Sequence, residues 1–130
     1  MLAIVVGCLS GAGGASAGVK VAEVITTEEA AQHLQETNTV CGVVASTKYA
    51  ERSRERPTYL NFDRPFPEQS FAAVITEAAR AKFKVAPEAA FNGKNVCVTG
   101  LITANSRGKP QIIVTDPAQI KINDAAPPAQ

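Results

Sequence analysis

Two apolar, β-branched runs with a glycine at their centre constrain the fold of this 130-residue chain more than any other feature. The run "TVCGVVASTKY" contains Gly42, and the run "NVCVTGLITA" contains Gly100. A glycine inside a strand pattern indicates a bulge or a sharp bend. In a small closed barrel a strand must bend in this way to take part in both sheets. The two runs therefore predict bent strands of a barrel.

Three further runs complete the strand pattern: "PTYLNFD", "SFAAVIT" and "QIIVT". Alternation along the first predicts one face with Thr58, Leu60 and Phe62 and an opposite face with Tyr59, Asn61 and Asp63. Between the third and fourth strands, "EAARAKFKVAPEAAF" is helical in composition, and Pro87 breaks or restarts the helix. Five strands with a helix between the third and the fourth predict a mainly β protein with an OB-fold barrel.

The segment before the barrel is expected to contain a further helix. Thr26 or Thr27 can cap its start, acidic residues fill its first turn, and helix formers continue to about Glu36. His33 lies there without any partner motif, which predicts a surface residue with no catalytic role. The domain organisation expected is a lead-in and helix over 18–38, the barrel over 39–122 and a disordered tail over 123–130.

The first residues resemble an export signal. An apolar run is followed by small residues, and Ala15-Ser16-Ala17 fits the pattern that a signal peptidase reads, so residues 1–17 are expected to be a signal peptide. The run is too short to span a bilayer as a helix, and no basic residue precedes it. Two alternatives stay open. Val5-Val6-Gly7-Cys8 resembles a lipobox with Cys8 as the lipidated residue, or the segment is a glycine- and alanine-rich arm of a cytosolic protein.

Cleavage after Ala17 would leave two cysteines, Cys41 and Cys97. An even pair in an oxidising compartment favours a disulfide, and the alternative is two buried reduced cysteines in strands. The sequence has no CxxC motif, no histidine cluster and no metal-ligand spacing, so we expect no zinc, no other metal and no cofactor.

Charge is unevenly distributed, although the net charge is only +1. Twelve basic and seven acidic residues lie between 40 and 122, whereas the flanking segments have an excess of acidic residues. A basic body is compatible with a polyanionic partner, and equally with an ordinary solvated surface.

At this point the residues resemble a family. The stretches "PTYLNF", "VCVTG" and "GKPQIIVTDPAQI" are the most specific parts of a resemblance to the small bacterial OB-fold nucleic-acid-binding domains. These domains occur alone behind a signal peptide, or beside nuclease domains in exported proteins. The resemblance covers about Val40 to Ile120. It implies an exported, periplasmic or extracellular protein that binds nucleic acid, with a nuclease or another protein as a further expected partner.

In the topology that this resemblance implies, the first and fourth strands are neighbours. Cys41 and Cys97 lie on those strands. A cross-strand disulfide between them is then feasible if their Cα atoms lie roughly 4.4–6.8 Å apart.

OB-folds bind ligands over their second and third strands, between the loop after the first strand and the loop after the fourth. These loops are "KYAERSRERP" and "NSRGKP". The resemblance therefore implies a groove with two basic rims, in which Tyr59 stacks a base and Asn61 hydrogen-bonds it. The rim cations expected are Lys48, Arg52, Arg54, Arg56, Arg107 and Lys109. The alternative for the first loop is pairing of its arginines with Glu51 and Glu55.

The function expected is non-catalytic binding of nucleic acid by this groove, with a single strand of DNA or RNA as the expected ligand. A protein- or oligosaccharide-binding module on the same fold is the alternative, because the fold alone does not determine the function. No nucleophile–base pair, no carboxylate pair at a spacing useful for catalysis and no metal site is evident, so we do not expect an enzyme. Five phenylalanines are expected to be core residues or loop plugs: Phe62, Phe66, Phe71, Phe83 and Phe91.

Overall fold

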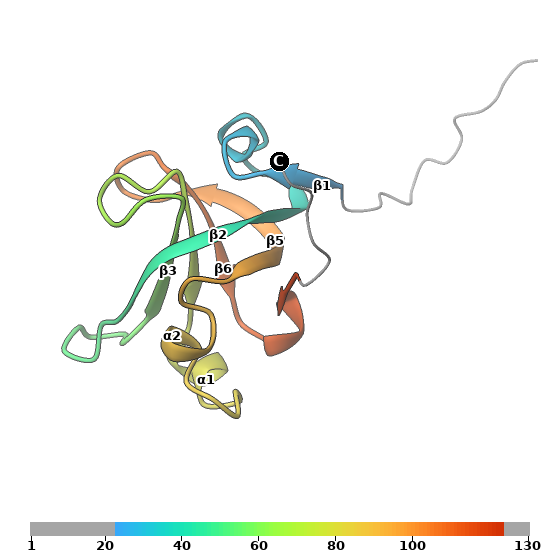
Figure 1. Cartoon of the computed structure of the whole chain (residues 1–130). Helices are drawn as coiled ribbons and strands as arrows, with labels where there is room; N and C mark the ends of the chain where they lie inside the picture. Colours follow the sequence, from blue (N-terminus) through green and yellow to red (C-terminus); the bar gives the residue numbers. More distant parts are fainter. Residues whose placement is uncertain (1–22, 124–130) are drawn as a thin grey trace, which may run out of the picture.

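A computed structural model describes residues 23–123 and contains, over that range, seven strands and four short helices (Figure 1). The strands are β1 (Val24–Thr26), β2 (Thr37–Tyr49), β3 (Thr58–Phe62), β4 (Phe71–Ile75), β5 (Asn95–Ala104), β6 (Pro110–Val114) and β7 (Ile120–Ile122). The helices are the 3₁₀ helices η2 (Glu29–Gln32) and η3 (Pro117–Gln119) and the α-helices α1 (Glu77–Arg80) and α2 (Pro87–Ala90). The predicted signal peptide and almost all of the predicted tail lie outside the described residues.

Five of the strands close into a barrel. β2 pairs with both β3 and β5, β3 pairs with β4, and β6 joins β4 in parallel and β5 in antiparallel orientation. β1 and β7 extend the sheet beside β2 and β5. The predicted mainly β fold with an OB-type five-stranded barrel is confirmed, and α1 and α2 lie between the third and fourth barrel strands, at one end of the barrel (Figure 1).

Both central glycines lie where a strand changes partner. β2 pairs with β5 up to Val43 and with β3 from Val44 onward, and β5 passes from β2 to β6 directly after Leu101. A Cβ atom on Gly42 would lie 2.7 Å from Cγ2 of Thr27, and one on Gly100 would lie 2.7 Å from Cγ2 of Ile112. The bends thus bring other residues too close for any side chain, which explains the glycines.

The barrel interior is filled by aliphatic side chains and a few aromatic rings. Phe62 and Phe71 are fully buried and meet edge to face, with ring centres 5.2 Å apart. Phe83 and Phe91 form a second edge-to-face pair against this core. These four phenylalanines pack as expected, but Phe66 does not, because 59% of it is exposed.

The helix expected up to Glu36 is shorter in the structure. Thr26 and Glu29 cap each other reciprocally at the start of η2, with N···O distances of 3.1 and 2.9 Å. Gln35 then adopts a positive φ of 72°, and its backbone N–H donates to the carbonyl of Ile102 at 2.6 Å. The hydrogen bond from Gln35 to β5 therefore ends the helix after one turn, although the residues up to Glu36 are good helix formers.

Cys41 and Cys97 form a disulfide between β2 and β5, as expected. The two residues are direct partners in the antiparallel register, and their Cα atoms lie 4.0 Å apart, just below the usual range. Neither side chain belongs to the barrel core, because the core residues of β2 and β5 are the alternating Val40, Val96 and Val98. The disulfide therefore lies on the outer surface of the sheet.

Candidate functional site

A groove of about 400 Å³ lies over the outer face of the barrel, above β3, β4 and β6. Strand register defines its floor: Asn61 is paired with Ala72, and Ala72 with Gln111. Tyr59 lies on the same face of β3, with Lys48 of β2 as its neighbour. The walls are two loops, and the residues that line the groove are Lys48, Tyr59, Asn61, Phe66, Gln69, Ala72, Asn105, Ser106, Arg107 and Gln111.

Four of the eight predicted binding residues meet in this groove. They are Lys48, Tyr59, Asn61 and Arg107. Asn61 is more enclosed than an outward-facing residue was expected to be, since it is only 4% exposed and its Nδ2 donates to Oγ of Ser46 at 3.2 Å. Its register partner Ala72, which has only a methyl side chain, lines the groove beside it.

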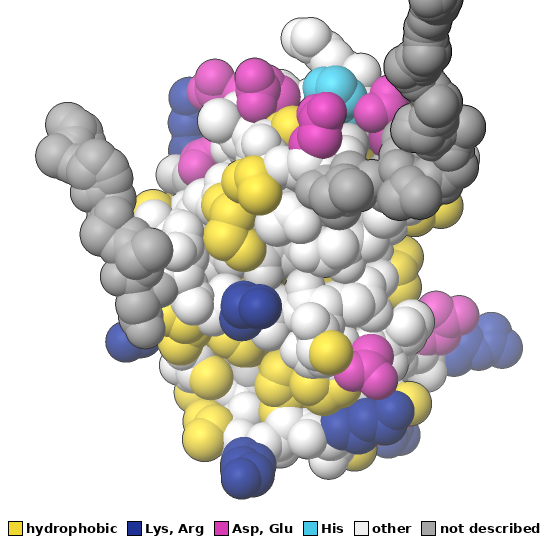
Figure 2. All heavy atoms as spheres, turned by 90° about the vertical axis from the view of Figure 1, so that its right-hand side faces the viewer, with side chains coloured by type: hydrophobic (Ala, Val, Ile, Leu, Met, Phe, Trp, Pro, Cys, Tyr) yellow, Lys and Arg dark blue, Asp and Glu magenta, His cyan; other side chains and the backbone are white. Residues whose placement is uncertain are grey.

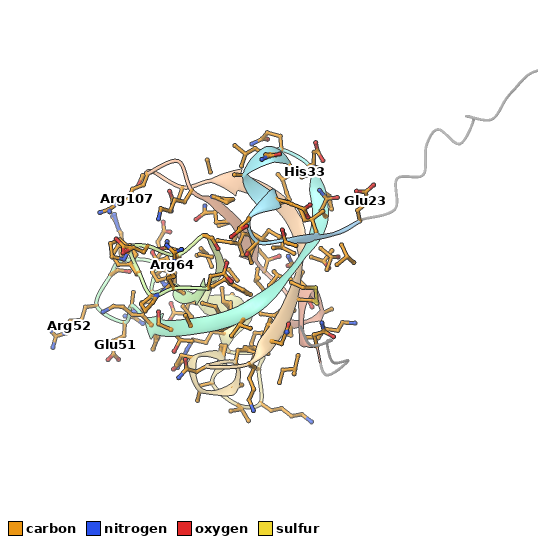
Figure 3. All side chains as sticks on the ribbon, turned by 45° about the horizontal axis from the view of Figure 1, so that its top comes forward. Glu23, His33, Glu51, Arg52, Arg64 and Arg107 are labelled. Atoms are coloured by element: carbon orange, nitrogen blue, oxygen red, sulfur yellow. A yellow bond between two sulfur atoms is a disulfide. The ribbon has the colours of Figure 1, made fainter. Side chains whose placement is uncertain are left out.

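One wall is the hairpin turn 105–109, which its own hydrogen bonds hold. The side-chain oxygen of Asn105 accepts from the backbone N–H of Arg107 at 2.7 Å and of Lys109 at 3.0 Å, and Gly108 supplies the positive φ. The Arg107 guanidinium extends from this turn and lies 5.4 Å from the centre of the Phe66 ring (Figure 3). Arg107 is thus presented at the groove edge by a rigid turn.

Lys109 has a different place from the one expected. Its Nζ donates to the carbonyl oxygens of Pro67 at 2.6 Å and of Gln69 at 3.1 Å. It therefore connects the hairpin 105–109 to the loop 63–70, two segments that lie side by side in Figure 1. Two of its three N–H donors are used by the protein itself, so Lys109 positions the opposite wall of the groove.

The arginines of the loop 50–57 are not grouped in the groove. Arg56 pairs with Glu77 on α1 at 3.2 Å, rather than with a neighbouring glutamate of its own loop. Arg52 lines a second hollow of about 450 Å³ together with Lys48, Tyr49 and Glu51. Arg54 is exposed on the same loop, whose tip projects away from the barrel at the side that also bears Arg107 (Figure 3).

Arg80, a further cation of the basic body, is engaged in packing. It makes two hydrogen bonds to the Glu88 carboxylate, at 2.6 and 3.2 Å, and its guanidinium lies 3.7 Å above the Tyr49 ring centre. The hydrogen bond from Arg80 lowers the pKa of Glu88 below its ordinary value, and the same bond raises the pKa of Arg80. The pair links α1 and α2, and the contact of Arg80 with Tyr49 links both to β2.

Apart from Asn105 and Ser106, which belong to the predicted loop, four residues that line the groove were missed by sequence reasoning: Phe66, Gln69, Ala72 and Gln111. Phe66 stands between two prolines in "RPFPEQS", and an aromatic residue in such a turn-rich segment is a signal that points to exposure rather than to the core. Gln111 alternates with the buried Ile112, which would have placed it on the outer face of β6. No sequence signal identifies Gln69, because its place depends on the contact of its loop with Lys109.

Acidic side chains gather at another end of the molecule. Figure 2 shows them around the single histidine, and the exposed acids of the segment before β2 are Glu23, Glu28, Glu29 and Glu36. His33 contacts Glu36 at 2.8 Å. In Figure 3, Glu23 and His33 lie on the side away from Arg52, Arg64 and Arg107. The groove is therefore separated from the acidic surface.

Within residues 23–123, no three metal-binding side chains come together, and no helix of this range is long and apolar enough to cross a membrane.

Comparison with known proteins gives no family assignment. No protein-family model matches the chain, and no curated protein matches it in sequence. One solved structure with a similar arrangement is described as "a putative aspartyl-tRNA synthetase from Leishmania major Friedlin". The sequence identity is 11% and the TM-score 0.47, over 87% of this chain. The chain spans 23% of the length of that protein.

Proposed function

We propose that this protein is a non-catalytic module that binds single-stranded nucleic acid in the groove over β3, β4 and β6. The observation that supports it most is the convergence of Lys48, Tyr59, Asn61 and Arg107, from separate segments, on one groove of about 400 Å³. The face is the one that OB-folds use for oligonucleotides and oligosaccharides, an analogy that raises the expectation without deciding the ligand.

The groove offers what a nucleotide requires. Tyr59 on the floor and Phe66 on the wall provide rings for stacking a base. Lys48 and Arg107 provide positive charge for the phosphates on either side of it. The amides of Asn61 and Gln111 provide hydrogen-bonding groups on the floor between them. Stacking on aromatic side chains tolerates any base, so this arrangement supports binding with little sequence preference.

Binding of a labelled single-stranded oligonucleotide, followed by fluorescence anisotropy, tests the stacking. Each stacked base contributes about 1–3 kcal/mol, so Tyr59→Leu and Phe66→Leu should each weaken binding by roughly 5- to 150-fold. Phe83→Leu, at a phenylalanine that packs against the core and does not line the groove, serves as the control for general destabilisation. Unchanged affinity in both groove variants, with the wild type binding, would contradict the placement of the nucleotide.

An oligosaccharide is the second candidate ligand. The groove contains four amide side chains and two aromatic rings but only two cations, a composition that also suits a neutral, hydroxyl-rich ligand. Binding of neutral oligosaccharides that is insensitive to salt, together with no binding of oligonucleotides at low salt, would favour this candidate.

We also propose that the protein acts outside the cytoplasm. The disulfide between Cys41 and Cys97 supports this, because such bonds persist in oxidising compartments.

A further inference from the structure

Gln69 lies in the wall of the groove with an unsatisfied hydrogen-bond acceptor. The residue is 4% exposed and lines the groove. Its Oε1 is buried and, among the described residues, has no hydrogen-bond partner. Buried polar side-chain atoms in folded proteins almost always have a partner, so an exception at a groove requires an explanation.

The backbone around Gln69 is well held, so loose packing does not explain the exception. The carbonyl of Gln69 accepts from Nζ of Lys109 at 3.1 Å, and the next residue, Ser70, hydrogen-bonds Asp63 through its side chain. The backbone N–H of Ser70 donates to the carbonyl of Phe62 at 3.3 Å. The side chain is therefore brought to the groove by a segment fixed at both of its sides.

A ligand can relieve the unsatisfied oxygen. The last torsion of a glutamine side chain is soft and has two broad minima, so the amide can turn toward the groove without leaving its place. Its oxygen would then accept a hydrogen bond from an N–H group of a molecule lying on Tyr59. Leaving a buried acceptor unpaired costs free energy, and a ligand that donates to it recovers that cost as affinity.

We propose that Gln69 is a specificity-determining residue that reads the hydrogen-bonding edge of one unpaired nucleobase. This inference rests on the function proposed above. Every nucleobase has an N–H donor on its Watson–Crick edge, whereas the phosphodiester backbone of DNA has none to offer the oxygen. In a duplex that edge is occupied by the partner strand. Gln69 thus explains why the groove should select single strands over duplexes, which cations at its rim alone would not do.

The size of the groove agrees with one base as the unit that is read. A volume of about 400 Å³ is at the lower end of the range for small-molecule pockets, about 300–1,000 Å³. The remainder of the strand would run outside the groove, toward the second hollow, which shares Lys48 with it.

The test compares the wild type with Gln69→Met, which keeps the side-chain length and removes the acceptor. Three labelled probes of equal length are used at low salt: a single strand, a hairpin duplex and a single strand with abasic sites throughout. Gln69→Met should bind the single strand roughly three- to tenfold more weakly, since a single hydrogen bond is lost. Its melting temperature should be equal to or above that of the wild type, because no unpaired oxygen remains buried. Gln32→Met, on the exposed surface of η2, is the matched control and should change neither quantity.

The remaining probes separate reading of the base from attraction to the backbone. The wild type should bind the duplex at least tenfold more weakly than the single strand, and the abasic strand should not distinguish the wild type from Gln69→Met. Equal binding of the single strand by both proteins would overturn the role of Gln69 and leave the proposed function standing. Equal binding of duplex and single strand by the wild type would also overturn it. A wild type that binds no oligonucleotide at all would overturn the proposed function, and this inference with it.

Discussion

At the scale of single residues, the two cations of the hairpin 105–109 have different surroundings although they lie two positions apart. Arg107 extends from the turn toward Phe66 and makes no ion pair with any described residue. Lys109 is bound to the carbonyls of Pro67 and Gln69. Their spacing in the sequence makes the two cations look equivalent. Their contacts differ, because Lys109 is engaged within the protein, whereas Arg107 lies at the groove edge and is available to the proposed ligand.

This difference predicts separate effects for two alanine variants. Arg107→Ala should weaken oligonucleotide binding and leave the melting temperature unchanged. Lys109→Ala should lower the free energy of unfolding by about 1 kcal/mol, because charge-assisted hydrogen bonds to carbonyls are lost at a partly exposed site. It should also weaken binding, because the wall that carries Phe66 and Gln69 loosens. Thermal denaturation and fluorescence anisotropy of both variants measure the two effects. A melting temperature of Lys109→Ala identical to that of the wild type would contradict the role given to Lys109.

The pair of Arg80 and Glu88 predicts a pH dependence of stability. Hydrogen bonding to Arg80 lowers the pKa of the Glu88 carboxyl in the folded protein, so its contribution is fully present above the ordinary glutamate pKa and is lost as the pH falls through the folded value. Glu88→Gln should therefore destabilise the protein by about 1 kcal/mol at pH 7. The difference from the wild type should shrink in acid. Denaturant unfolding of both proteins from neutral to acidic pH measures the difference in their free energies of unfolding. A difference that stays constant with pH would contradict the prediction.

At the scale of elements, the bends of β2 and β5 determine where the groove can form. Only because β2 leaves β5 after Val43 can it place Lys48 beside Tyr59. Gly42 permits this bend, since its Cα lies close under Thr27 and Phe62. Thr27 also attaches the segment before the barrel to the loop after β3, because its hydroxyl donates a hydrogen bond to the Asp63 carboxylate at 2.5 Å.

Gly42→Ala should therefore destabilise the fold. The new Cβ would lie 2.7 Å from Cγ2 of Thr27 and 3.2 Å from the ring of Phe62, and overpacking of this kind costs about 1–3 kcal/mol. Thr27→Ser removes the clashing methyl group and keeps the hydroxyl that binds Asp63. The double variant should recover part of the loss in chemical denaturation. A double variant as unstable as the sum of both single ones would show that Thr27 is not the obstacle.

The elements that could be predicted from the sequence are those that local pattern determines. The alternation of "PTYLNF" and the glycines of the two long runs predicted the strands and their bends. The N-terminal helix was predicted too long, because a tertiary hydrogen bond from Gln35 to Ile102 ends it. Composition cannot reveal that contact, which joins residues 67 positions apart.

At the scale of the whole molecule, the disulfide closes the two bent strands against each other. Cys41 and Cys97 are 56 residues apart, and closing a loop of that length stabilises the folded state by on the order of 4 kcal/mol in the chain-entropy model. The Cys41→Ala/Cys97→Ala variant should lose up to this amount in denaturant unfolding. Reduction of the wild type should match it, and an unchanged midpoint would contradict the stabilising role. The groove lies elsewhere on the barrel. The variant without the disulfide should therefore still bind the oligonucleotide under conditions in which it is fully folded.

The candidate site was partly predictable at this scale. The OB-type order placed Tyr59, Asn61 and the two loops on one face, and four predicted residues meet there. The contribution of the loop 50–57 to the groove was overestimated, because its Arg56 pairs with Glu77, 21 residues further along the chain. Gln69 was missed, because a loop held by a contact from Lys109 some 40 residues away leaves no local pattern. Phe66 was missed although its place between two prolines indicated exposure.

The most direct test of the central claim is the salt dependence of single-strand binding by the wild type and by Arg107→Ala. The affinity of the wild type should fall linearly with the logarithm of the salt concentration, with a slope of about −0.7 for each phosphate contacted. Arg107→Ala should bind more weakly and have a slope shallower by about 0.7, equivalent to one lost phosphate contact. Binding that is absent at low salt, or equal in both proteins with the same slope, would contradict the account of this groove as a nucleic-acid site.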